Sequence, residues 1–334
     1  MRGSVDYQIT RIFNESGIFR PGTSRHKEKG QARATLVQRG YAATSEALAE
    51  ATGLHSYNYA RDCKDTWHHQ GRFAKERFGL KDMTGLTAEH VDHYLLKRIK
   101  DGIAYDSWKK EAAHIGKLEN ALRKLASTES ETEYESPGIR MAALDPELRF
   151  MARETLARSS KTFGHFDNPE AVIECLESAS YPDFALAARV QLEGGARCRE
   201  VCLIAEKQLH GLAGDQLTGR MHGQVHLTDT KGGKPRTIQV STELYAELEK
   251  AVARKGAFHV SMGSYTKAVH KAARASGEIL GGTHAFRYCF ARRRYRELTM
   301  PSPAGAGLTH EAAIQQVSWE MGHERADITL LYLR

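Results

Sequence analysis

A segment near the middle of the chain, STESETEYESPGIR (residues 127–140), contains four glutamates, a Pro-Gly pair and few apolar residues. Such a stretch has no apolar face to bury, and the Pro-Gly pair favours a turn, so it predicts an exposed linker. A chain of 334 residues is also longer than one domain usually needs. We therefore expect two folded domains, residues 25–126 and residues 141–334, preceded by an N-terminal extension of residues 1–24.

Hydrophobic periodicity predicts that the first of these domains is all helical. Residues 34–54, 87–102 and 105–126 carry apolar side chains at three- and four-residue spacing, and the second stretch starts at a threonine and ends in basic residues and glycine. Residues 1–126 hold 22 Lys and Arg against 15 Asp and Glu, whereas residues 141–334 hold 25 against 22. This basic excess favours a surface that approaches a polyanion, with a merely solvated basic surface as an equal alternative.

In the second domain the period of the pattern changes once. Helical patterns over residues 168–179 and 181–205 give way to GQVHLTDT (residues 223–230) and KPRTIQV (residues 234–240), which alternate like strands around a KGG turn. Helical patterns then continue to the end of the chain, interrupted by a loop over residues 299–309. The predicted fold class is mainly α with a small antiparallel β-sheet.

Composition excludes several classes of protein. No apolar run approaches the length of a membrane span, and the first residues lack the apolar core of a secretory signal. Neither clustered carboxylates for Mg²⁺ nor a Walker-type loop for ATP is present, so we expect no metal and no cofactor. The cysteines are odd in number, scattered and without a CxxC pair, which favours reduced thiols in a cytoplasm; they are Cys63, Cys175, Cys198, Cys202 and Cys289.

Two places in the second domain carry charged groups that a purely structural segment does not require. Arg197 follows two glycines in an apolar context, and Glu200 lies one helical turn later. The arginine can pair with this glutamate or bind a phosphate, and from this stretch alone the structural pairing is favoured. Lys231 lies at the turn of the predicted hairpin. Its flexible ammonium group is either solvated or able to stay close to a leaving group during a reaction.

Two further places lie near the end of the chain. In THAFRYCFA, His284 and Arg287 share one face of a helix that begins at a threonine, where the helix dipole favours an anion. His323 belongs to a Gly-His pair, and Tyr332 follows nine positions later. A lone tyrosine in this position packs in a core more often than it reacts. Between these motifs, the run at residues 292–294 (Arg-Arg-Arg) favours a solvated or backbone-contacting face, and Trp319 is predicted to be buried.

Taken in order, these residues form a set suited to phosphodiester chemistry without a metal. Paired guanidinium groups can clamp the non-bridging oxygens and stabilise the charge that develops on a pentacoordinate phosphorus. A tyrosine oxygen can attack the phosphorus and hold the strand covalently. A lysine can protonate the departing oxygen, and histidines can transfer protons near neutral pH.

The second domain resembles the tyrosine recombinases, the phage-integrase family of site-specific DNA recombinases. GGARCRE is similar to the first-arginine motif of that family and TKGGKPRTIQV to its β-hairpin lysine motif. THAFRYCFA is similar to its His-x-x-Arg motif, and MGHERADITLLYL to its Gly-His pair followed by the nucleophilic tyrosine. The first domain resembles the family's helical core-binding domain in character only, without a sharp motif.

The resemblance implies a role for each of these residues. Arg197 and Arg287 would bind the scissile phosphate, supported by Glu200, and Lys231 would protonate the 5′-hydroxyl leaving group. The remaining roles fall to His284, which would assist proton transfer, His323, which would hydrogen-bond the phosphate, and Tyr332, which would form a 3′-phosphotyrosyl link.

The same resemblance implies the partners. The protein would bind double-stranded DNA at inverted-repeat sites and form a homotetramer on synapsed DNA, with a possible accessory DNA-bending protein and no membrane. It would be cytoplasmic and nucleoid-associated when bound to DNA. Two other functions stay open at this point: relaxation of DNA by a type IB topoisomerase, and a catalytically silent DNA-binding architectural protein.

The sequence departs from the family pattern in three places. Tyr288 stands where the family often has a second histidine, which the resemblance alone gives little weight. The loop at residues 299–311 is longer than usual. Many members also continue past the tyrosine into a helix that docks on the neighbouring protomer, whereas this sequence has two residues after Tyr332. The resemblance therefore leaves the coupling between protomers open.

Overall fold

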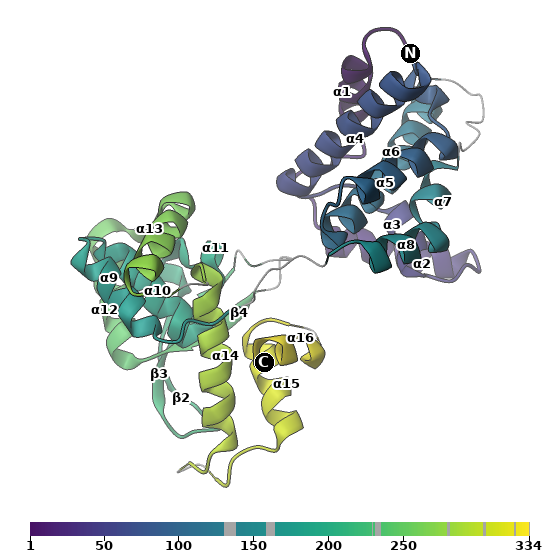
Figure 1. Cartoon of the computed structure of the whole chain (residues 1–334). Helices are drawn as coiled ribbons and strands as arrows, with labels where there is room; N and C mark the ends of the chain where they lie inside the picture. The colour runs from purple at the N-terminus through teal and green to yellow at the C-terminus, as the bar shows by residue number, and fades with distance from the viewer. Residues whose placement is uncertain are drawn as a thin grey trace. The chain divides into compact units, whose positions relative to one another are not determined.

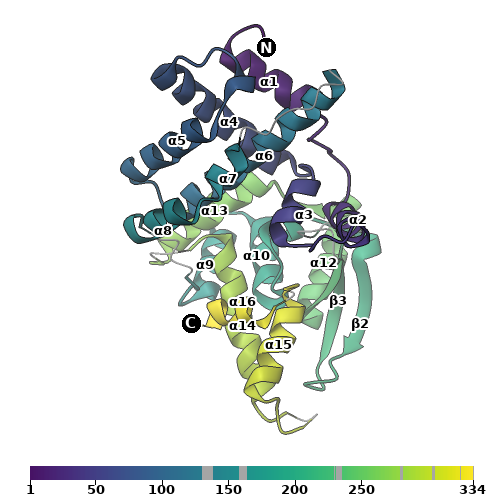
Figure 2. The same ribbon diagram turned by 90° about the vertical axis from the view of Figure 1, so that its right-hand side faces the viewer.

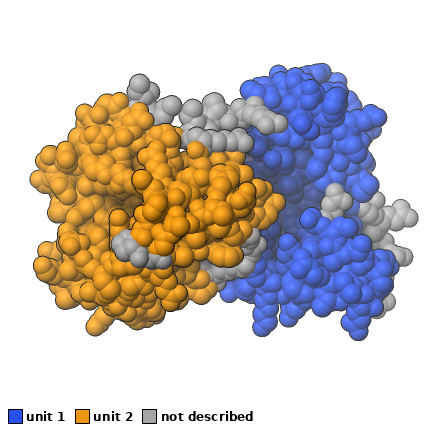
Figure 3. Space-filling model, turned by 90° about the horizontal axis from the view of Figure 1, so that it is seen from below, with its two compact units in different colours: residues 1–161 blue, residues 162–334 orange. Residues whose placement is uncertain are grey.

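The computed structural model describes residues 1–129, 138–157, 164–228, 230, 235–278, 281–302, 305–323 and 325–333, without the side chains of residues 46 and 127–129 (Figure 1). The chain forms two compact units, Met1–Lys161 and Thr162–Arg334 (Figure 3). None of the described helices is both long enough and apolar enough to cross a membrane.

The boundary between the units lies later than the linker expected at residues 127–140. The helices that follow this segment bury Ile139, Leu148 and Ala152 in the same hydrophobic cluster as Trp67 and Trp108 of the preceding helices. Chain on both sides of the acidic segment therefore contributes to one core, and the predicted boundary is wrong. The acidic composition marks a connection within the first unit rather than a division between domains.

The N-terminal extension expected at residues 1–24 is also part of the first unit. Helix α1 (Val5–Glu15) begins at the Ser4 cap and buries Val5, Ile9 and Ile12 in the core of the unit. These three side chains have the spacing of a helix face. The pattern was therefore present in the sequence, and the separate extension is a wrong prediction.

The described part of the first unit is helical, as expected. The helix predicted over residues 34–54 is split at Gly40, which adopts a left-handed backbone with φ of 76°. The helix predicted over residues 87–102 begins at Thr87 as the cap residue. After α1 the helices are α2 (Arg25–Gln38), α3 (Ser45–Ala51), α4 (Tyr57–Phe78), α5 (Ala88–Lys100), α6 (Tyr105–Glu129), α7 (Ile139–Ala143) and α8 (Pro146–Thr155).

The second unit combines helices with two small antiparallel sheets (Figure 1). Its helices are α9 (Pro169–Ser178), α10 (Pro182–Gly194), α11 (Cys198–Val201), α12 (Thr242–Lys255), α13 (Met262–Ala275), α14 (Thr283–Thr299), α15 (His310–Glu320) and α16 (Ala326–Leu333). Its strands are β1 (Leu203–Ala205), β2 (Leu209–Gly214), β3 (Met221–Leu227), β4 (Arg236–Val240) and β5 (Ala257–His259).

The predicted hairpin is confirmed by the antiparallel pairing of β3 with β4, in which Val225 faces Ile238 and Leu227 faces Arg236. Its turn, including Lys231, lies outside the described residues. Strand β2 pairs with the other side of β3, beside which it lies in Figure 2, and β1 pairs with β5 in a separate two-stranded sheet. The predicted mainly helical fold with small antiparallel sheets is therefore confirmed.

The described residues of the second unit form two hydrophobic clusters. The larger one fills the space between α9, α10, α12, α13 and the strands. The smaller one, which we call the C-terminal cluster, joins α14 to α15 and α16. It consists of Tyr288, Phe290, Ala291, Leu298, Ala313, Val317, Met321 and Tyr332, with five partly buried side chains packed against it. The helix that carries Tyr332 therefore depends on this smaller core.

Candidate active site

Arg197 is placed by a break in the helix predicted across residues 181–205. Helix α10 ends at Gly194, and Gly195 takes a left-handed backbone with φ of 62°. A Cβ at Gly195 would lie 2.3 Å from the ring of Phe290, so close packing also requires glycine there. Arg197 then caps the short helix α11, with about a fifth of its side chain exposed.

Glu200 anchors this arginine. Its Oε1 accepts a hydrogen bond from Nη1 of Arg197 at 2.7 Å, and its Oε2 accepts from the backbone N–H of Arg197, also at 2.7 Å. Burial would raise the pKa of Glu200, but Arg236 and Arg197 outweigh this effect and hold the pKa below its usual value. The ion pair predicted from the sequence is confirmed.

Arg287 lies at the centre of the site and is completely buried. Its guanidinium donates to the carbonyl oxygens of Gly195 and Met321, and Nη2 also lies 3.1 Å from Nε2 of His323. Burial and the neighbouring cations Arg197 and Arg236 lower the pKa of Arg287 to about 9. Nε of Arg287 is buried without a hydrogen-bond partner. A buried cation beside other cations is unfavourable unless an anion joins it.

His323 is held as a neutral imidazole. Because a guanidinium only donates, Nε2 of His323 must accept from Arg287, which leaves the ring proton on Nδ1, 3.4 Å from Oγ1 of Thr329. Burial, followed by the charges of Arg287, Arg197 and Arg236, lowers the pKa of His323 to about 3. The low pKa of His323 thus indicates a strongly positive electrostatic potential at this position.

Tyr332 faces this group from α16. Its hydroxyl lies 3.1 Å from Nε2 of His284, which is in the first turn of α14. Its ring stacks on Tyr288 with centroids 4.2 Å apart and an interplanar angle of 25°, and lies 5.3 Å from the ring of His323. The structure therefore gives Tyr288, the departure from the family pattern, direct contact with the expected nucleophile.

Five of the expected site residues and the supporting glutamate lie in one place. The structure brings together Arg197, Glu200, His284, Arg287, His323 and Tyr332. Lys231 lies outside the described residues. Within the described ranges, no three His, Cys, Asp or Glu side chains converge as a metal site would need.

Sequence reasoning did not single out Arg236, which belongs to the same cluster. Its Nη2 donates to Oε2 of Glu200 at 2.5 Å, and its side chain is about 9% exposed. In β4 it shares one face with the buried Ile238 and Val240. An arginine on the apolar face of a predicted strand was the signal that could have found it.

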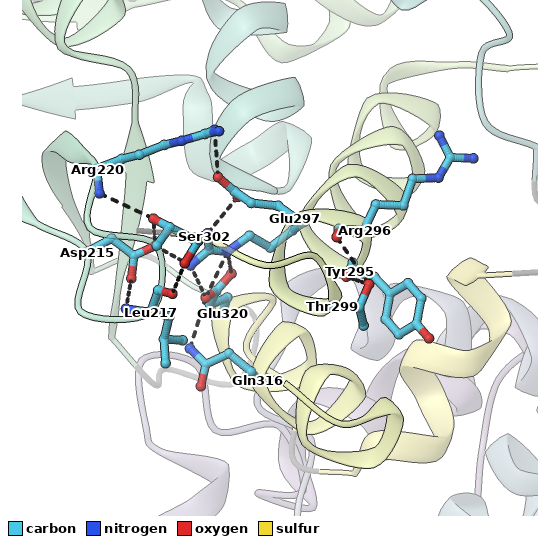
Figure 4. A network of polar contacts seen from close by, with 12 residues as sticks. Asp215, Leu217, Arg220, Tyr295, Arg296, Glu297, Thr299, Ser302, Gln316 and Glu320 are labelled. Carbon is cyan, nitrogen blue, oxygen red and sulfur yellow. Dashed lines mark hydrogen bonds and ion pairs between the residues drawn. The ribbon is translucent and has the colours of Figure 1, made fainter. Parts of the chain in front are cut away.

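Within the arginine run of α14, Arg294 differs from the expected solvated face, whereas the side chain of Arg293 is about half exposed. Arg294 is buried and forms ion pairs with Asp215 at 2.9 Å, Glu297 at 2.6 Å and Glu320 at 2.9 Å. Figure 4 shows these three carboxylates converging from the β2–β3 turn, α14 and α15. Residues 287, 291, 294 and 298 of α14 are all buried, at helical spacing. Arg294 thus belongs to the interior stripe of the helix.

A cavity of about 770 Å³ lies beside Arg236, between β3, β4 and the helices α10, α14 and α15. Arg236, Arg294 and Trp319 contribute to its wall. Trp319 is 62% exposed, so its predicted burial is wrong. Helix α15 turns its apolar face, with Ala313 and Val317, toward the C-terminal cluster and leaves Trp319 on the other side.

The arrangement is suited to bind an anion next to a phenol. Among the residues that the structure describes, Glu200 supplies the one carboxylate that Arg197, Arg236 and Arg287 share, so the described cluster carries excess positive charge. The phenol of Tyr332 lies beside an imidazole nitrogen that can accept its proton. A tetrahedral oxyanion bound here would neutralise the excess positive charge. It would also be the group with which the phenol reacts.

Binding of an anion is expected to raise the pKa of His323. In the free protein the surrounding arginines favour the neutral ring, and a bound phosphate would oppose their field, so the pKa should rise from about 3 toward the ordinary value of ~6.5. NMR titration of the His323 ring with and without inorganic phosphate measures this change. An unchanged pKa at saturating phosphate would contradict an anion site at this position.

Comparison with known proteins shows similarity at the level of the fold. No protein-family model matches the sequence, and no curated protein sequence matches it significantly. Among solved structures, the XerH site-specific recombinase bound to palindromic difH substrate, in a post-cleavage complex, aligns with a TM-score of 0.60 at 13% identity. The alignment covers 98% of this chain and 91% of that chain.

Two further solved structures are similar. A lambda integrase tetramer bound to a Holliday junction has a TM-score of 0.51 at 15% identity and covers 93% of this chain and 78% of that chain. The Tn1549 transposon integrase in complex with circular intermediate DNA has a TM-score of 0.50 at 13% identity, with 94% and 96% covered. With its clustered arginines, histidines and C-terminal tyrosine, this chain has the fold of the tyrosine recombinases.

Proposed function

We propose that this chain is a site-specific DNA recombinase that cuts and rejoins DNA through a 3′-phosphotyrosyl intermediate, for integration or excision of a mobile element. The observation that carries the proposal is the Tyr332 hydroxyl, 3.1 Å from Nε2 of His284 and within electrostatic reach of Arg287. A phenol beside a proton acceptor and next to clustered guanidinium groups is the arrangement that nucleophilic attack on a phosphodiester requires.

In the proposed reaction, the Tyr332 oxygen forms a bond to phosphorus as the bond to the 5′-oxygen breaks. His284 accepts the phenolic proton, and Lys231 gives a proton to the departing 5′-oxygen. The phosphodiester energy is kept in the phosphotyrosyl link, so attack by a 5′-hydroxyl of the partner strand rejoins DNA without ATP or a metal. Reversal of the same proton transfers restores the free tyrosine.

Arg197 and Arg287 bind the phosphate in this scheme, and His323 hydrogen-bonds it. Arg197 is partly exposed, and its Nη2 makes long contacts, 3.4 Å and 3.5 Å, to the carbonyl oxygens of Met321 and Gly322. Arg287 has no exposed surface. In this scheme a phosphate meets Arg197 first, and its access to Arg287 requires a shift of the Met321 carbonyl oxygen, which accepts a hydrogen bond from Arg287.

The proposed partner is double-stranded DNA with inverted half-sites, bound by a homotetramer on synapsed DNA and helped by an accessory DNA-bending protein. The XerH structure on a palindromic substrate supports the DNA partner, and the lambda integrase tetramer on a Holliday junction supports the tetramer. In the first unit, α2 has no buried residue and carries Arg25, Lys27, Lys29 and Arg33. Such a helix suits phosphate contacts, whose affinity falls steeply with salt. The site of action would be the cytoplasmic nucleoid.

A nicked suicide substrate carrying an end of the mobile element tests the proposal. With EDTA present, the protein should form a covalent adduct, and mass mapping should place the 3′-phosphate on residue 332. Salt-sensitive binding without any adduct would instead favour a catalytically silent architectural protein. Relaxation of supercoiled DNA regardless of sequence, without strand exchange, would favour a type IB topoisomerase.

A further inference from the structure

Arg236 connects parts of the active site that are far apart in the sequence. From the start of β4 its Nη2 donates to Oε2 of Glu200 at 2.5 Å, and its Nη1 donates to the carbonyl oxygen of Glu320 at 2.6 Å. Glu200 is the anchor of Arg197, and Glu320 is the last residue of α15, directly before the turn that carries His323. One guanidinium therefore joins the first arginine motif to the Gly-His turn.

The contacts of Arg236 leave it unsuited to bind a phosphate itself. Both terminal nitrogens donate to protein oxygens, with a long contact of 3.5 Å from Nη2 to Gly195 as well. Nε is buried without a partner, and the side chain is about 9% exposed. The side chain of Arg197, by contrast, is 22% exposed and keeps long contacts that a ligand can replace. The two arginines thus have different tasks.

Steric contact adds to these hydrogen bonds. Gly322 adopts φ of 67°, and a Cβ at this position would lie 2.8 Å from Cδ of Arg236 and 3.1 Å from its Nε. The turn before His323 is therefore packed directly on the arginine side chain. Its shape depends on the position of Arg236 as well as on the backbone freedom of glycine.

We propose that Arg236 is a positioning residue that holds Arg197 and the His323 turn in the arrangement that binds the scissile phosphate. This inference rests on the proposed function, because it concerns the same site. The planar fork of a guanidinium can donate to two acceptors in fixed directions, which a lysine ammonium cannot reproduce. A displacement of about 1 Å in a catalytic group can reduce a rate by ~100-fold.

The closing experiment compares Arg236→Met and Arg236→Lys with Arg220→Met as the matched control. Arg220 lines the same cavity, but its side chain is 76% exposed and pairs with Glu297. Single-turnover adduct formation on the suicide substrate and binding to a half-site duplex are measured for each variant. We expect ~100-fold slower adduct formation in Arg236→Met, with half-site affinity within about twofold and the control unchanged.

A second readout needs no DNA and separates this inference from the proposed function. Among the described residues, the groups that face His323 are Arg197, Arg236, Arg287, His284 and the ring of Tyr332, with Thr329 on Nδ1. Removing one of these cations in Arg236→Met should raise the pKa of His323. In Arg236→Lys the charge remains, so that pKa should change little while adduct formation still falls by at least ~10-fold.

The outcomes distinguish the possibilities. A wild-type adduct rate in Arg236→Met or Arg236→Lys would overturn the inference. A loss of half-site affinity as large as the loss of rate would also overturn it, because Arg236 would then act as a DNA ligand or through the fold. If the wild-type protein forms no adduct, the proposed function fails, and an unmoved His323 titration in Arg236→Met would then overturn the positioning role separately.

Discussion

The Tyr332→Phe variant is expected to form no covalent adduct with nicked DNA, while its affinity for the same DNA stays within about twofold of wild type. The phenylalanine ring keeps the stacking on Tyr288 and the packing in the C-terminal cluster, so the fold should be preserved. What is lost is the oxygen that lies 3.1 Å from His284. A missing nucleophile removes the chemical step outright. Gel analysis of the suicide-substrate reaction measures the effect.

Tyr295→Phe is the matched control for this experiment. Tyr295 lies on α14, and its hydroxyl hydrogen-bonds His310 at a distance of 2.7 Å, away from the arginine cluster. This variant should form the adduct at the wild-type rate. An adduct that persists in Tyr332→Phe would contradict the assignment and would direct attention to Tyr288, whose ring lies beside that of Tyr332.

Replacement of Arg294 by methionine should lower the free energy of unfolding by about 3–5 kcal/mol. Methionine has a similar length but cannot donate to Asp215, Glu297 and Glu320, all within 2.9 Å of Arg294 (Figure 4). Loss of one partner from a buried ion-pair network leaves uncompensated charge, which is much more harmful than loss of a surface pair. Urea unfolding of the two proteins measures the difference.

Arg293→Met supplies the comparison on the neighbouring residue. Arg293 pairs with Glu170 through side chains that are both about half exposed, so its replacement should change stability by less than ~1 kcal/mol. If Arg294→Met lowered the free energy of unfolding no more than Arg293→Met does, water would have to hydrate the three carboxylates in the variant. The cavity of about 770 Å³ beside them would be the place to seek it.

Sequence patterns predicted the hairpin and part of the helices because their signals are local. Thr87 caps its helix, and the alternation in residues 223–227 and 236–240 marks β3 and β4. The short strands β1 and β5 were missed, since three residues carry no measurable period. The domain boundary was misplaced because composition alone does not distinguish a connection inside a core from a link between cores.

The candidate site was predictable only in part for a similar reason. Arg197 and Glu200 are one helical turn apart, so their pairing could be read from the sequence. Arg236 and Arg294 pair with carboxylates 36 and 79 residues away, which no local pattern contains. The fold also places Tyr288 against Tyr332, 44 positions later in the chain. The resemblance to the family had given Tyr288 little weight.

The separate C-terminal cluster has a consequence for the kinetics of the protein. Tyr332 sits on α16, which packs on this small cluster rather than on the main core of its unit. Elements with few buried contacts open more readily than the body of a domain. The observed rate of any reaction at Tyr332 is then the intrinsic rate multiplied by the fraction of molecules in which α16 is docked. Conditions that loosen this helix would slow turnover long before the rest of the protein unfolds.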